Sequence, residues 1–357
     1  MKKLAIIQPT LAPYRVVTFN KLTEYFDVTV YADIQREKTQ FEGANNQRKY
    51  KFLIVNAKIK KLFSAIFIQR ELLKVNESFV LAYANINNIS IWLLLFKSKL
   101  FTKQKVYLHG QGLYNKKNLS IWSKLAYRLF FGLSKKYIFY NDFCKYSTCK
   151  KLKISEGKMD VVPNTLPIKP LNFEEFEDIK KDKKDILFIG RLRPGTNIEL
   201  LLDIFSDSSF ADKDIKLHIV GGGVLLQSLK EKYLDNENIV FWGAIYEEDE
   251  ILKVSKSCLC GVYPGDAGLS IVHYMALGVV PIVHDSFEQH MGPEPAYLEN
   301  NFTSLFFKKG SRIDLQKVIE YCLKNRTSSI DIAEKSLIFF SNNLCFDSAE
   351  RFAGIIK

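Results

Sequence analysis

Short apolar runs alternate with segments of helical periodicity along almost the whole chain, and this alternation constrains the fold more than any other feature. Between the apolar runs lie segments with apolar residues at helical spacing, among them residues 62–75 and 120–133. This strand–helix–strand rhythm predicts a doubly wound α/β fold with a parallel sheet. The strands expected in the first half are residues 4–7, 28–31, 79–83, 105–108, 137–140 and 160–162.

The rhythm pauses once and then resumes, which predicts two domains. Residues 166–184 are rich in Pro, Glu, Asp and Lys and carry no apolar period, so we expect an interdomain linker. The pattern restarts at residues 185–190, and two Rossmann-like halves are the simplest account of the 357 residues. Strands are then expected at 217–220, 239–242, 259–263 and 280–283, and helices at 197–205, 225–234, 248–255, 269–277 and 313–324.

The charge is distributed unevenly between the two halves. Residues 1–150 hold 26 basic and 8 acidic residues, whereas the remainder holds 25 basic and 31 acidic residues. A basic half indicates an anionic partner, either nucleic acid, an anionic membrane or a phosphorylated substrate. A lysine-rich surface that serves solubility explains the same numbers.

Membrane-spanning and secreted classes do not fit the sequence. The longest apolar stretch, residues 89–96, falls short of the roughly 18–20 residues that span a bilayer. The first apolar run is too short for a signal peptide, and none of the six cysteines forms a C-x-x-C pair. We therefore expect a cytoplasmic protein with reduced thiols, with a peripheral position at the inner face of the plasma membrane as an option.

Candidate functional residues follow the expected strands, because ligands of open α/β sheets bind at the carboxyl ends of the strands. In the first half these residues are Tyr14, Arg15 and His109. In the second half, glycine-rich turns at 221–223 and 264–270 accompany two arginines that follow Gly190. Glycine lets the backbone approach phosphate, and arginine pairs with its oxygens, so an anion cradle is expected. Any one of these glycines would equally serve a tight turn.

Several other kinds of site are excluded by the motifs. The first strand is not followed by G-x-G-x-x-G, and no G-x-x-x-x-G-K-[ST] loop occurs. The D-x-D at residues 212–214 precedes an expected strand, so we interpret it as a solvated loop and not as a metal–diphosphate site. The five histidines match no zinc spacing, and His218 lies inside a strand, which favours a structural role.

In its motifs the chain resembles the retaining nucleotide-sugar glycosyltransferases of the GT-B fold, family 4 (glycosyltransferase group 1). The matching segments occur in the family's order: Val161-Val-Pro-Asn-Thr165, Phe188-Ile-Gly-Arg-Leu192, His218-Ile-Val-Gly-Gly-Gly223, Val240-Phe-Trp-Gly243, Gly268-Leu-Ser-Ile-Val-His-Tyr-Met-Ala-Leu-Gly278 and Pro281-Ile-Val283. The resemblance implies two Rossmann-like domains facing across a cleft. Residues 1–165 would bind the acceptor, 185–340 would bind the donor, and a C-terminal helix within 341–357 would cross back to the first domain.

The resemblance also implies the roles of the site residues. Arg191 would pair with the donor diphosphate, the amides of residues 268–270 would cap it, and His109 would lie near the reacting sugar. The implied donor-binding set is Gly190, Arg191, Arg193, Thr196, Gly221, Gly223, Gly243, Gly268, Leu269, Ser270, His273 and Glu294. The implied catalytic residues are His109 and Asp266, and the implied acceptor-side residues are Tyr14, Arg15 and Asn164. No metal and no cofactor are expected, because the nucleotide-diphosphate sugar is a co-substrate.

Three positions depart from the family pattern. Thr196 stands where the family has a lysine, and Gly265 and His273 stand where it has two glutamates, with Asp266 beside the first. A related branch combines the Gly-Leu-Ser…His segment with His-x-x-Pro-Glu, here ending at Glu294, so we expect a divergent but working site. His273 is expected to contact the nucleoside, with a core histidine as the alternative.

The function that the resemblance implies is transfer of a sugar, with retention, to a glycan or lipid-diphosphate-linked acceptor in bacterial surface polysaccharide synthesis. A nucleotide-sugar 2-epimerase of the same fold and a degenerate, non-catalytic subunit of a glycan-assembly complex remain as alternatives. Nucleic acid is not an expected partner, because no reader motif occurs. Residues 57–75 combine five basic with several apolar residues, so we expect there an interfacial helix on an anionic membrane or an ordinary core-packing helix.

Overall fold

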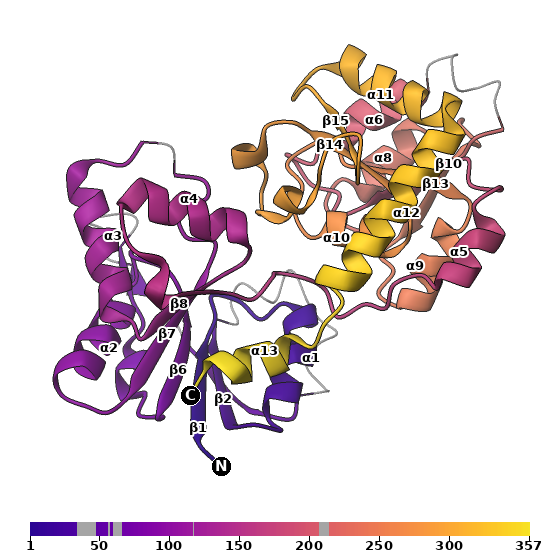
Figure 1. Cartoon of the computed structure of the whole chain (residues 1–357). Helices are drawn as coiled ribbons and strands as arrows, with labels where there is room; N and C mark the ends of the chain where they lie inside the picture. The colour runs from indigo at the N-terminus through magenta and orange to yellow at the C-terminus, as the bar shows by residue number, and fades with distance from the viewer. Residues whose placement is uncertain (34–47, 56–57, 60–65, 117, 207–213) are drawn as a thin grey trace. The chain divides into compact units, whose positions relative to one another are not determined.

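The computed structural model describes residues 1–33, 48–55, 58–59, 66–116, 118–206 and 214–357 (Figure 1). The chain divides into two compact units. The N-terminal unit consists of Met1–Pro163 together with Asp347–Lys357, and the C-terminal unit consists of Asn164–Phe346. Each unit contains its own parallel sheet, as the alternating pattern predicts, and the doubly wound α/β class is confirmed.

The N-terminal unit is built on a seven-stranded sheet in the order β3-β2-β1-β6-β7-β8-β9, in which every pair is parallel. Strands β1 and β6 are neighbours, so the chain order reverses between them and defines a topological switch point. The strands are β1 (Lys3–Ile7), β2 (Asp27–Ala32), β3 (Lys51–Ile54), β6 (Phe79–Tyr83), β7 (Lys105–Gly110), β8 (Lys136–Phe139) and β9 (Met159–Val161).

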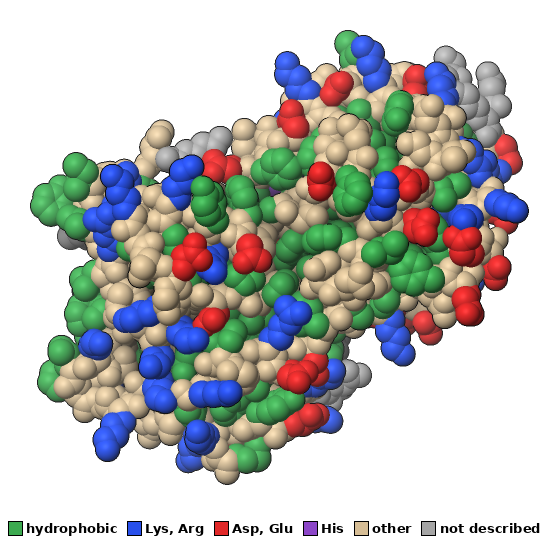
Figure 2. Space-filling view, in the orientation of Figure 1, with side chains coloured by type: hydrophobic (Ala, Val, Ile, Leu, Met, Phe, Trp, Pro, Cys, Tyr) green, Lys and Arg blue, Asp and Glu red, His purple; other side chains and the backbone are tan. Residues whose placement is uncertain are grey.

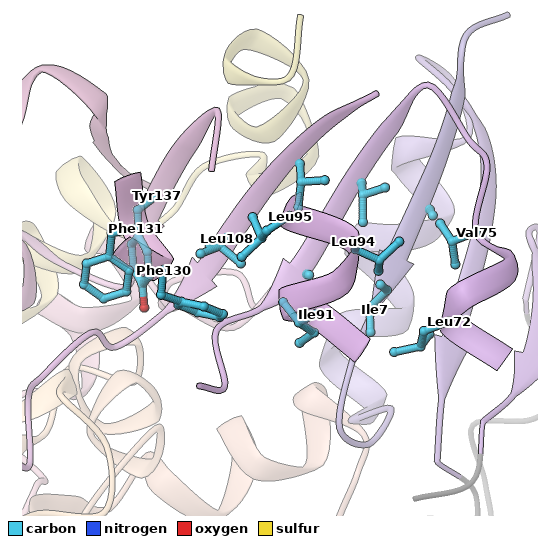
Figure 3. Packing of buried hydrophobic residues seen from close by; sticks show 14 of the residues in the cluster. Ile7, Leu72, Val75, Ile91, Leu94, Leu95, Leu108, Phe130, Phe131 and Tyr137 are labelled. Carbon is cyan, nitrogen blue, oxygen red and sulfur yellow. The ribbon is translucent and has the colours of Figure 1, made fainter. Parts of the chain in front are cut away.

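One face of this sheet packs against α2, α3 and α4 through a core of aliphatic and aromatic side chains (Figure 3). Ile91 and Leu94 of α2 and Phe130 of α3 are fully buried in this core. The start of each of the three helices is fixed by a polar N-cap that accepts a backbone N–H, namely Asn88, Ser120 and Asn141. The helices of this unit are α1 (Pro13–Leu22), α2 (Ile89–Leu100), α3 (Ile121–Leu133), α4 (Asp142–Leu152) and α13 (Ser348–Ile355).

The last helix, α13, belongs to the N-terminal unit and packs against α1. Asp347 caps it by accepting from the backbone of Ala349, and the same carboxylate lies 3.0 Å from the Lys21 ammonium of α1. The final residue is also held, because the Tyr107 hydroxyl donates to the carbonyl oxygen of Lys357 at 2.9 Å. These contacts join the last eleven residues to the first unit's sheet.

The C-terminal unit is built on a six-stranded parallel sheet in the order β12-β11-β10-β13-β14-β15, with the switch point between β10 and β13. The strands are β10 (Asp185–Ile189), β11 (Leu217–Val220), β12 (Ile239–Gly243), β13 (Cys258–Val262), β14 (Val280–His284) and β15 (Leu305–Phe307). The helices are α5 (Phe173–Ile179), α6 (Ile198–Phe205), α8 (Leu226–Lys232), α9 (Glu248–Ser255), α10 (Ser270–Ala276), α11 (Arg312–Lys324) and α12 (Arg326–Asn343).

The continuous helix expected over residues 62–75 is wrong at residues 66–69, and only a short 3-10 helix follows. Lys58–Ile59 and Phe67–Ile68 form a short antiparallel pair, β4 and β5, followed by a 3-10 helix at Arg70–Lys74, whereas residues 60–65 lie outside the described part. The buried Gln69 provides the reason. Its backbone N–H donates to the Ser90 hydroxyl at 2.9 Å, and its side-chain oxygen accepts from Asn88 at 2.7 Å, which holds the chain extended.

The segment expected to be a linker contains a packed helix of the C-terminal unit. Phe176 of α5 is fully buried, and a methyl group placed on Gly278 would meet its ring at 2.9 Å. Within this helix, Glu174, Glu177 and Asp178 lie on the exposed side. Within the described residues, no helix is long and apolar enough to cross a membrane.

Candidate functional site

The carboxyl edge of the C-terminal sheet is built from glycines whose backbones touch. Gly221 has a φ of 154°, and a methyl group there would collide with the carbonyl oxygen of Gly190. Its N–H donates to the carbonyl oxygen of Gly243 at 2.7 Å, and Gly223, at a φ of 144°, leaves equally little room beside Leu192. Only glycine fits such approaches. The loops after β10, β11 and β12 therefore form one closely packed backbone surface.

Two arginines lie on this backbone surface, beside the switch point between β10 and β13. Arg191 and Arg193 are exposed, and both act electrostatically on the Tyr263 hydroxyl, whose pKa is nevertheless raised by burial. Arg193 also contacts the Met291 sulfur at 2.9 Å. Thr196, which we expected to bind the donor, is buried, and its hydroxyl donates to the carbonyl oxygen of Arg193 at 2.8 Å. Thr196 therefore helps to fix the conformation of the loop after β10 that carries Arg191 and Arg193, which we call the arginine loop.

The turn after β13 and the first turn of α10 present one accessible face. Leu269, Ser270 and His273 are each partly exposed, while Ile271 and Val272 between them are buried. Positions three and four apart share a face of a helix, so His273 lies on the same side as the Gly268–Ser270 turn. Burial of the ring lowers the pKa of His273 to about 4, which leaves it neutral at physiological pH.

The segment between β14 and β15 holds that turn in place. The His290 Nδ1 atom accepts the N–H of Ala267 at 3.1 Å, and the N–H of Gly292 donates to the Ala267 carbonyl oxygen at 3.2 Å. Both polar groups of the Ala267 peptides are therefore engaged by residues 290–292. Glu294 is buried nearby, and its carboxylate oxygen would lie 3.7 Å from a methyl group on Gly268.

Asn164 lies in this C-terminal unit, although we expected it on the acceptor side. Its side-chain amide donates to the Glu294 carboxylate at 2.5 Å, and its carbonyl oxygen accepts from the Tyr297 hydroxyl at 3.2 Å. Asn164 therefore positions a residue of the expected donor set.

Three neighbouring strands, β13, β14 and β15, bring Asp266, His284 and Lys309 together at the same edge. The Asp266 carboxylate lies 3.1 Å from His284 Nε2 and 2.5 Å from the Lys309 ammonium. His284 Nδ1 accepts the N–H of Ser286 at 3.2 Å, so Nε2 carries the proton and donates to Asp266. Partial burial alone would raise the pKa of Asp266, but the hydrogen bonds from Lys309 and His284 hold it below its ordinary value. Asp266 is therefore ionised.

Replacing Lys309 by methionine should raise the pKa of Asp266 towards its ordinary value. The change removes the hydrogen bond and the positive charge that lower this pKa. Because the carboxylate then gains its proton at higher pH, the stability that it contributes will be lost at a higher pH as well. A carboxyl carbon NMR titration of Asp266 measures the shift. The neighbouring exposed Lys308→Met is the control, and an equal shift in both variants would show that the Lys309 contact is not the cause.

Two of the expected acceptor-side residues, Tyr14 and Arg15, lie at the carboxyl edge of the N-terminal sheet together with His109, which we expected to be catalytic. His109, in β7, is buried between Tyr140 and Phe352 of α13, with ring centroids 4.8 Å and 5.0 Å away. Arg15 reaches the Tyr140 hydroxyl at 3.4 Å and lies 5.4 Å from the ring of the partly exposed Tyr14. Burial and the nearby Arg15 charge lower the pKa of His109 well below its ordinary value. The imidazole is therefore neutral.

Two further predictions from the sequence concern His218 and the D-x-D at residues 212–214. His218 is buried between Asp185, 3.3 Å from Nε2, and the Trp242 indole N–H, which donates to Nδ1 at 3.1 Å. Of the D-x-D, residues 212 and 213 lie outside the described part, and Asp214 is exposed and paired with Lys184. Among the described side chains, no group of three or more His, Cys, Asp or Glu is arranged to hold a metal ion.

Sequence reasoning missed His284, Lys309 and Tyr140 as members of these clusters. Each follows or ends a strand, so a signal existed for His284, the last residue of β14. The pairing of Asp266 with Lys309 depends on β14 and β15 being neighbours, and the strand at Leu305–Phe307 was not expected from the sequence.

A known protein family matches the part of the chain that contains the carboxyl edge of the C-terminal sheet. Residues 172–337 match the model of the family described as glycosyl transferases, group 1. That segment covers most of the C-terminal unit, including the arginine loop and the Gly268 turn. The C-terminal unit therefore matches the group 1 glycosyl transferase model over most of its length, and the group 1 resemblance read from the motifs is confirmed.

Two curated proteins from Escherichia coli match a shorter stretch. They are the O-antigen biosynthesis glycosyltransferase WbnH and the probable O-antigen biosynthesis glycosyltransferase WbiN, each 34% identical over 96 residues. The match spans 27% of this chain and 26% of each relative, about a quarter of their length.

Solved structures match the chain over nearly its whole length. A glycosyltransferase from Rickettsia africae has a TM-score of 0.70 at 15% identity, covering 99% of this chain and 97% of that one. Alr3699/HepE from Anabaena, solved in complex with UDP, has a TM-score of 0.69 at 11% identity and covers 99% of both chains. At these identities the likeness shows the fold, which is that of GT-B glycosyltransferases.

Proposed function

We propose that this protein is a retaining glycosyltransferase that moves a sugar from a nucleoside-diphosphate sugar to a glycan or lipid-diphosphate-linked acceptor. The observation that carries the proposal is the grouping of Arg191, Arg193 and the Gly268–Ser270 turn around the β10–β13 switch point. Guanidinium groups and backbone N–H groups are the donors that bind diphosphate oxygens, and the glycines let such a ligand approach the backbone.

In the proposed reaction, the bond between the sugar's anomeric carbon and the diphosphate oxygen breaks, and the electron pair leaves with the nucleoside diphosphate. The acceptor hydroxyl forms the new bond on the same face and passes its proton to the departing phosphate oxygen. Arg191 and the turn amides stabilise the charge that develops on the leaving group. Asp266, ionised through Lys309 and His284, cannot donate a proton at neutral pH, so its role is to orient a sugar hydroxyl as an acceptor.

His109 and its neighbours form the proposed acceptor side. A neutral imidazole donates one N–H without adding a charge, which suits a hydrogen bond to the reacting sugar. Arg15 and Tyr14 supply a cation and an aromatic face beside it, groups that suit a phosphorylated glycan. The E. coli relatives act in O-antigen biosynthesis, which supports a surface polysaccharide as the product.

Arg191→Ala tests the donor assignment. The loss of a charge-assisted contact worth about 1.5–3 kcal/mol should weaken binding of the nucleoside diphosphate by one to two orders of magnitude, with little change in melting temperature. Isothermal titration calorimetry measures the affinity. Arg326→Ala is a matched control, because this exposed arginine bonds to the carbonyl oxygen of Lys181, before β10, at the opposite edge of the same sheet. Equal affinity in both variants would remove Arg191 from the site.

The reaction itself is tested by incubating the chain with a panel of nucleotide sugars and an acceptor extract, and by measuring release of nucleoside diphosphate and the anomeric configuration of the product. Transfer with retention is the expected result. Interconversion of the free nucleotide sugar would indicate the epimerase alternative. Tight donor binding without turnover on any acceptor would indicate a non-catalytic subunit, a reading that the engaged hydroxyl of Thr196 favours.

A further inference from the structure

The outer face of α3 in the N-terminal unit is apolar. Ile121, Trp122, Leu125 and Leu129 are all exposed and recur at helical spacing, so they form one continuous stripe. Trp122 is the most exposed of them, with 80% of its surface accessible. Phe130 and Phe131 of the same helix point into the core instead. Helix α3 therefore has two apolar faces. One face packs in the core of the N-terminal unit, and the other is exposed.

The neighbouring helix α2 extends this surface. Leu93, Phe96 and Leu100 are exposed, and Phe101 at its C-terminus is 80% accessible. Half-buried Trp92 links the two helices, because its ring lies 6.0 Å from Phe96 and 4.9 Å from Phe130 of α3. We call these eight exposed residues the α2–α3 surface: Leu93, Phe96, Leu100, Phe101, Ile121, Trp122, Leu125 and Leu129.

The charges around the α2–α3 surface have one sign. Residues 78–141 contain ten Lys and Arg and no Asp or Glu. Lys99 and Lys103 are exposed at the end of α2, and Lys124 and Arg128 lie on α3. Figure 2 shows hydrophobic and basic side chains together along the outer margin of this unit, where Figure 1 places α2 and α3, with no acidic side chain visible along that margin.

We propose that the α2–α3 surface docks the protein on an anionic lipid bilayer. Trp, Phe and Leu enter the interface between headgroups and acyl chains, while lysines at their border pair with lipid phosphates, which is the composition that interfacial helices require. A second copy of this chain is a poorer occupant. A symmetric contact would place the same basic rims against each other, and like charges repel.

The α2–α3 surface differs from the interfacial helix expected at residues 57–75, where the described residues form two short strands and a 3-10 helix. It also does not depend on the proposed sugar transfer, because none of its residues belongs to either carboxyl edge described above. Failure of lipid binding would leave the donor-binding proposal intact, and failure of donor binding would leave this one intact.

Vesicle flotation tests the proposal with the full chain. Vesicles of phosphatidylcholine containing phosphatidylglycerol should bind it, and phosphatidylcholine alone should bind it far less. Lys99→Gln, Lys103→Gln and Lys124→Gln together should weaken binding on the order of a hundredfold, since each lysine near an anionic leaflet contributes about a fivefold factor. The matched control changes three lysines of the C-terminal unit, Lys230, Lys253 and Lys324, to glutamine. Equal losses in both triple variants would overturn the specific surface.

The apolar contribution is tested at Trp122. Its fluorescence should shift to shorter wavelength on anionic vesicles and should be quenched by brominated acyl chains, and Trp122→Phe should remove most of the quenching. Trp242→Phe is the control, because Trp242 is also exposed, at 47%, but lies in the C-terminal unit. No quenching of Trp122 would overturn the proposal. Conversion of a lipid-free dimer to a monomer by Trp122→Gln with Leu125→Gln would assign the surface to a second copy instead and would overturn it as well.

Discussion

Gly221→Ala should lower the stability of the C-terminal unit by about 3 kcal/mol and abolish donor binding. At a φ of 154° an alanine is strained, and its methyl group would collide with the carbonyl oxygen of Gly190. Strain of this kind costs about 1–2 kcal/mol, and overpacking against rigid backbone adds about 1–3 kcal/mol. Relief requires the loops after β10 and β11 to separate, and the first of these carries Arg191.

Gly222→Ala is the matched control, one residue away in the same turn. Its φ is ordinary, and the added methyl group would meet only the Ala244 side chain at 3.3 Å. We expect a loss below about 1 kcal/mol and near-normal donor affinity. Urea unfolding and calorimetry with a nucleoside diphosphate measure both quantities. If Gly221→Ala is as stable as Gly222→Ala, the two loops do not pack as closely as the structure describes.

The strands and helices with clear periodicity could be predicted from the sequence. The expected strands at 79–83 and 217–220 and the expected helix at 248–255 coincide with β6, β11 and α9. In these segments the apolar pattern and the burial pattern agree, because each lies in the middle of a regular sheet or covers it with one face. The two-sheet organisation follows from the same signal.

Elements fixed by tertiary contacts could not be predicted in this way. Residues 66–75 have the apolar spacing of a helix, but the hydrogen bonds of Gln69 to Ser90 and Asn88 hold residues 67–69 extended, and only a 3-10 helix at Arg70–Lys74 follows. Helix α5 was hidden because Phe176 is its single buried side chain and four of its seven residues are acidic. In both segments a contact distant in sequence overrides the local pattern.

The candidate site also contains some residues that could be predicted from the sequence and others that could not. Glycines and arginines at strand ends are visible in the sequence, so Gly190, Arg191 and Gly221 could be expected to meet at one edge. The partners that position the site could not, since Asp266 meets Lys309 only through the order β13-β14-β15. Likewise, Asn164 lies far from Glu294 in sequence, and only the fold shows that the two are bonded.

His290 should make the C-terminal unit sensitive to acid. Its Nε2–H donates to the carbonyl oxygen of His284 at 3.0 Å, and its Nδ1 atom accepts the N–H of Ala267. The bond from Ala267 requires the neutral ring, because a protonated imidazole has no acceptor nitrogen. A protonated ring would point a second donor at the Ala267 N–H. Burial, and then the His284 ring stacked 3.6 Å away, lower the pKa of His290 to about 3.

The direction of the pH effect follows from this lowered pKa. At neutral pH neither the folded nor the unfolded state carries the proton, so no stability is lost. As the pH falls below about 6.5, the unfolded chain binds a proton that the folded ring refuses until about pH 3. The free energy of unfolding should therefore fall across this window, by about 5 kcal/mol from this residue alone.

His290→Asn isolates this contribution, because the asparagine oxygen can still accept from Ala267 but does not titrate. We expect the variant to be less stable than the natural protein at pH 7, by about 1–3 kcal/mol for the lost ring packing and the lost bond to His284. Between pH 6.5 and pH 4 its stability should fall less steeply, by the equivalent of up to one proton. Urea unfolding followed by Trp242 fluorescence, in a background with Trp92→Phe and Trp122→Phe, reports on the C-terminal unit. Parallel pH profiles for the two proteins would mean that His290 is not the acid-sensitive group that holds the Ala267 turn.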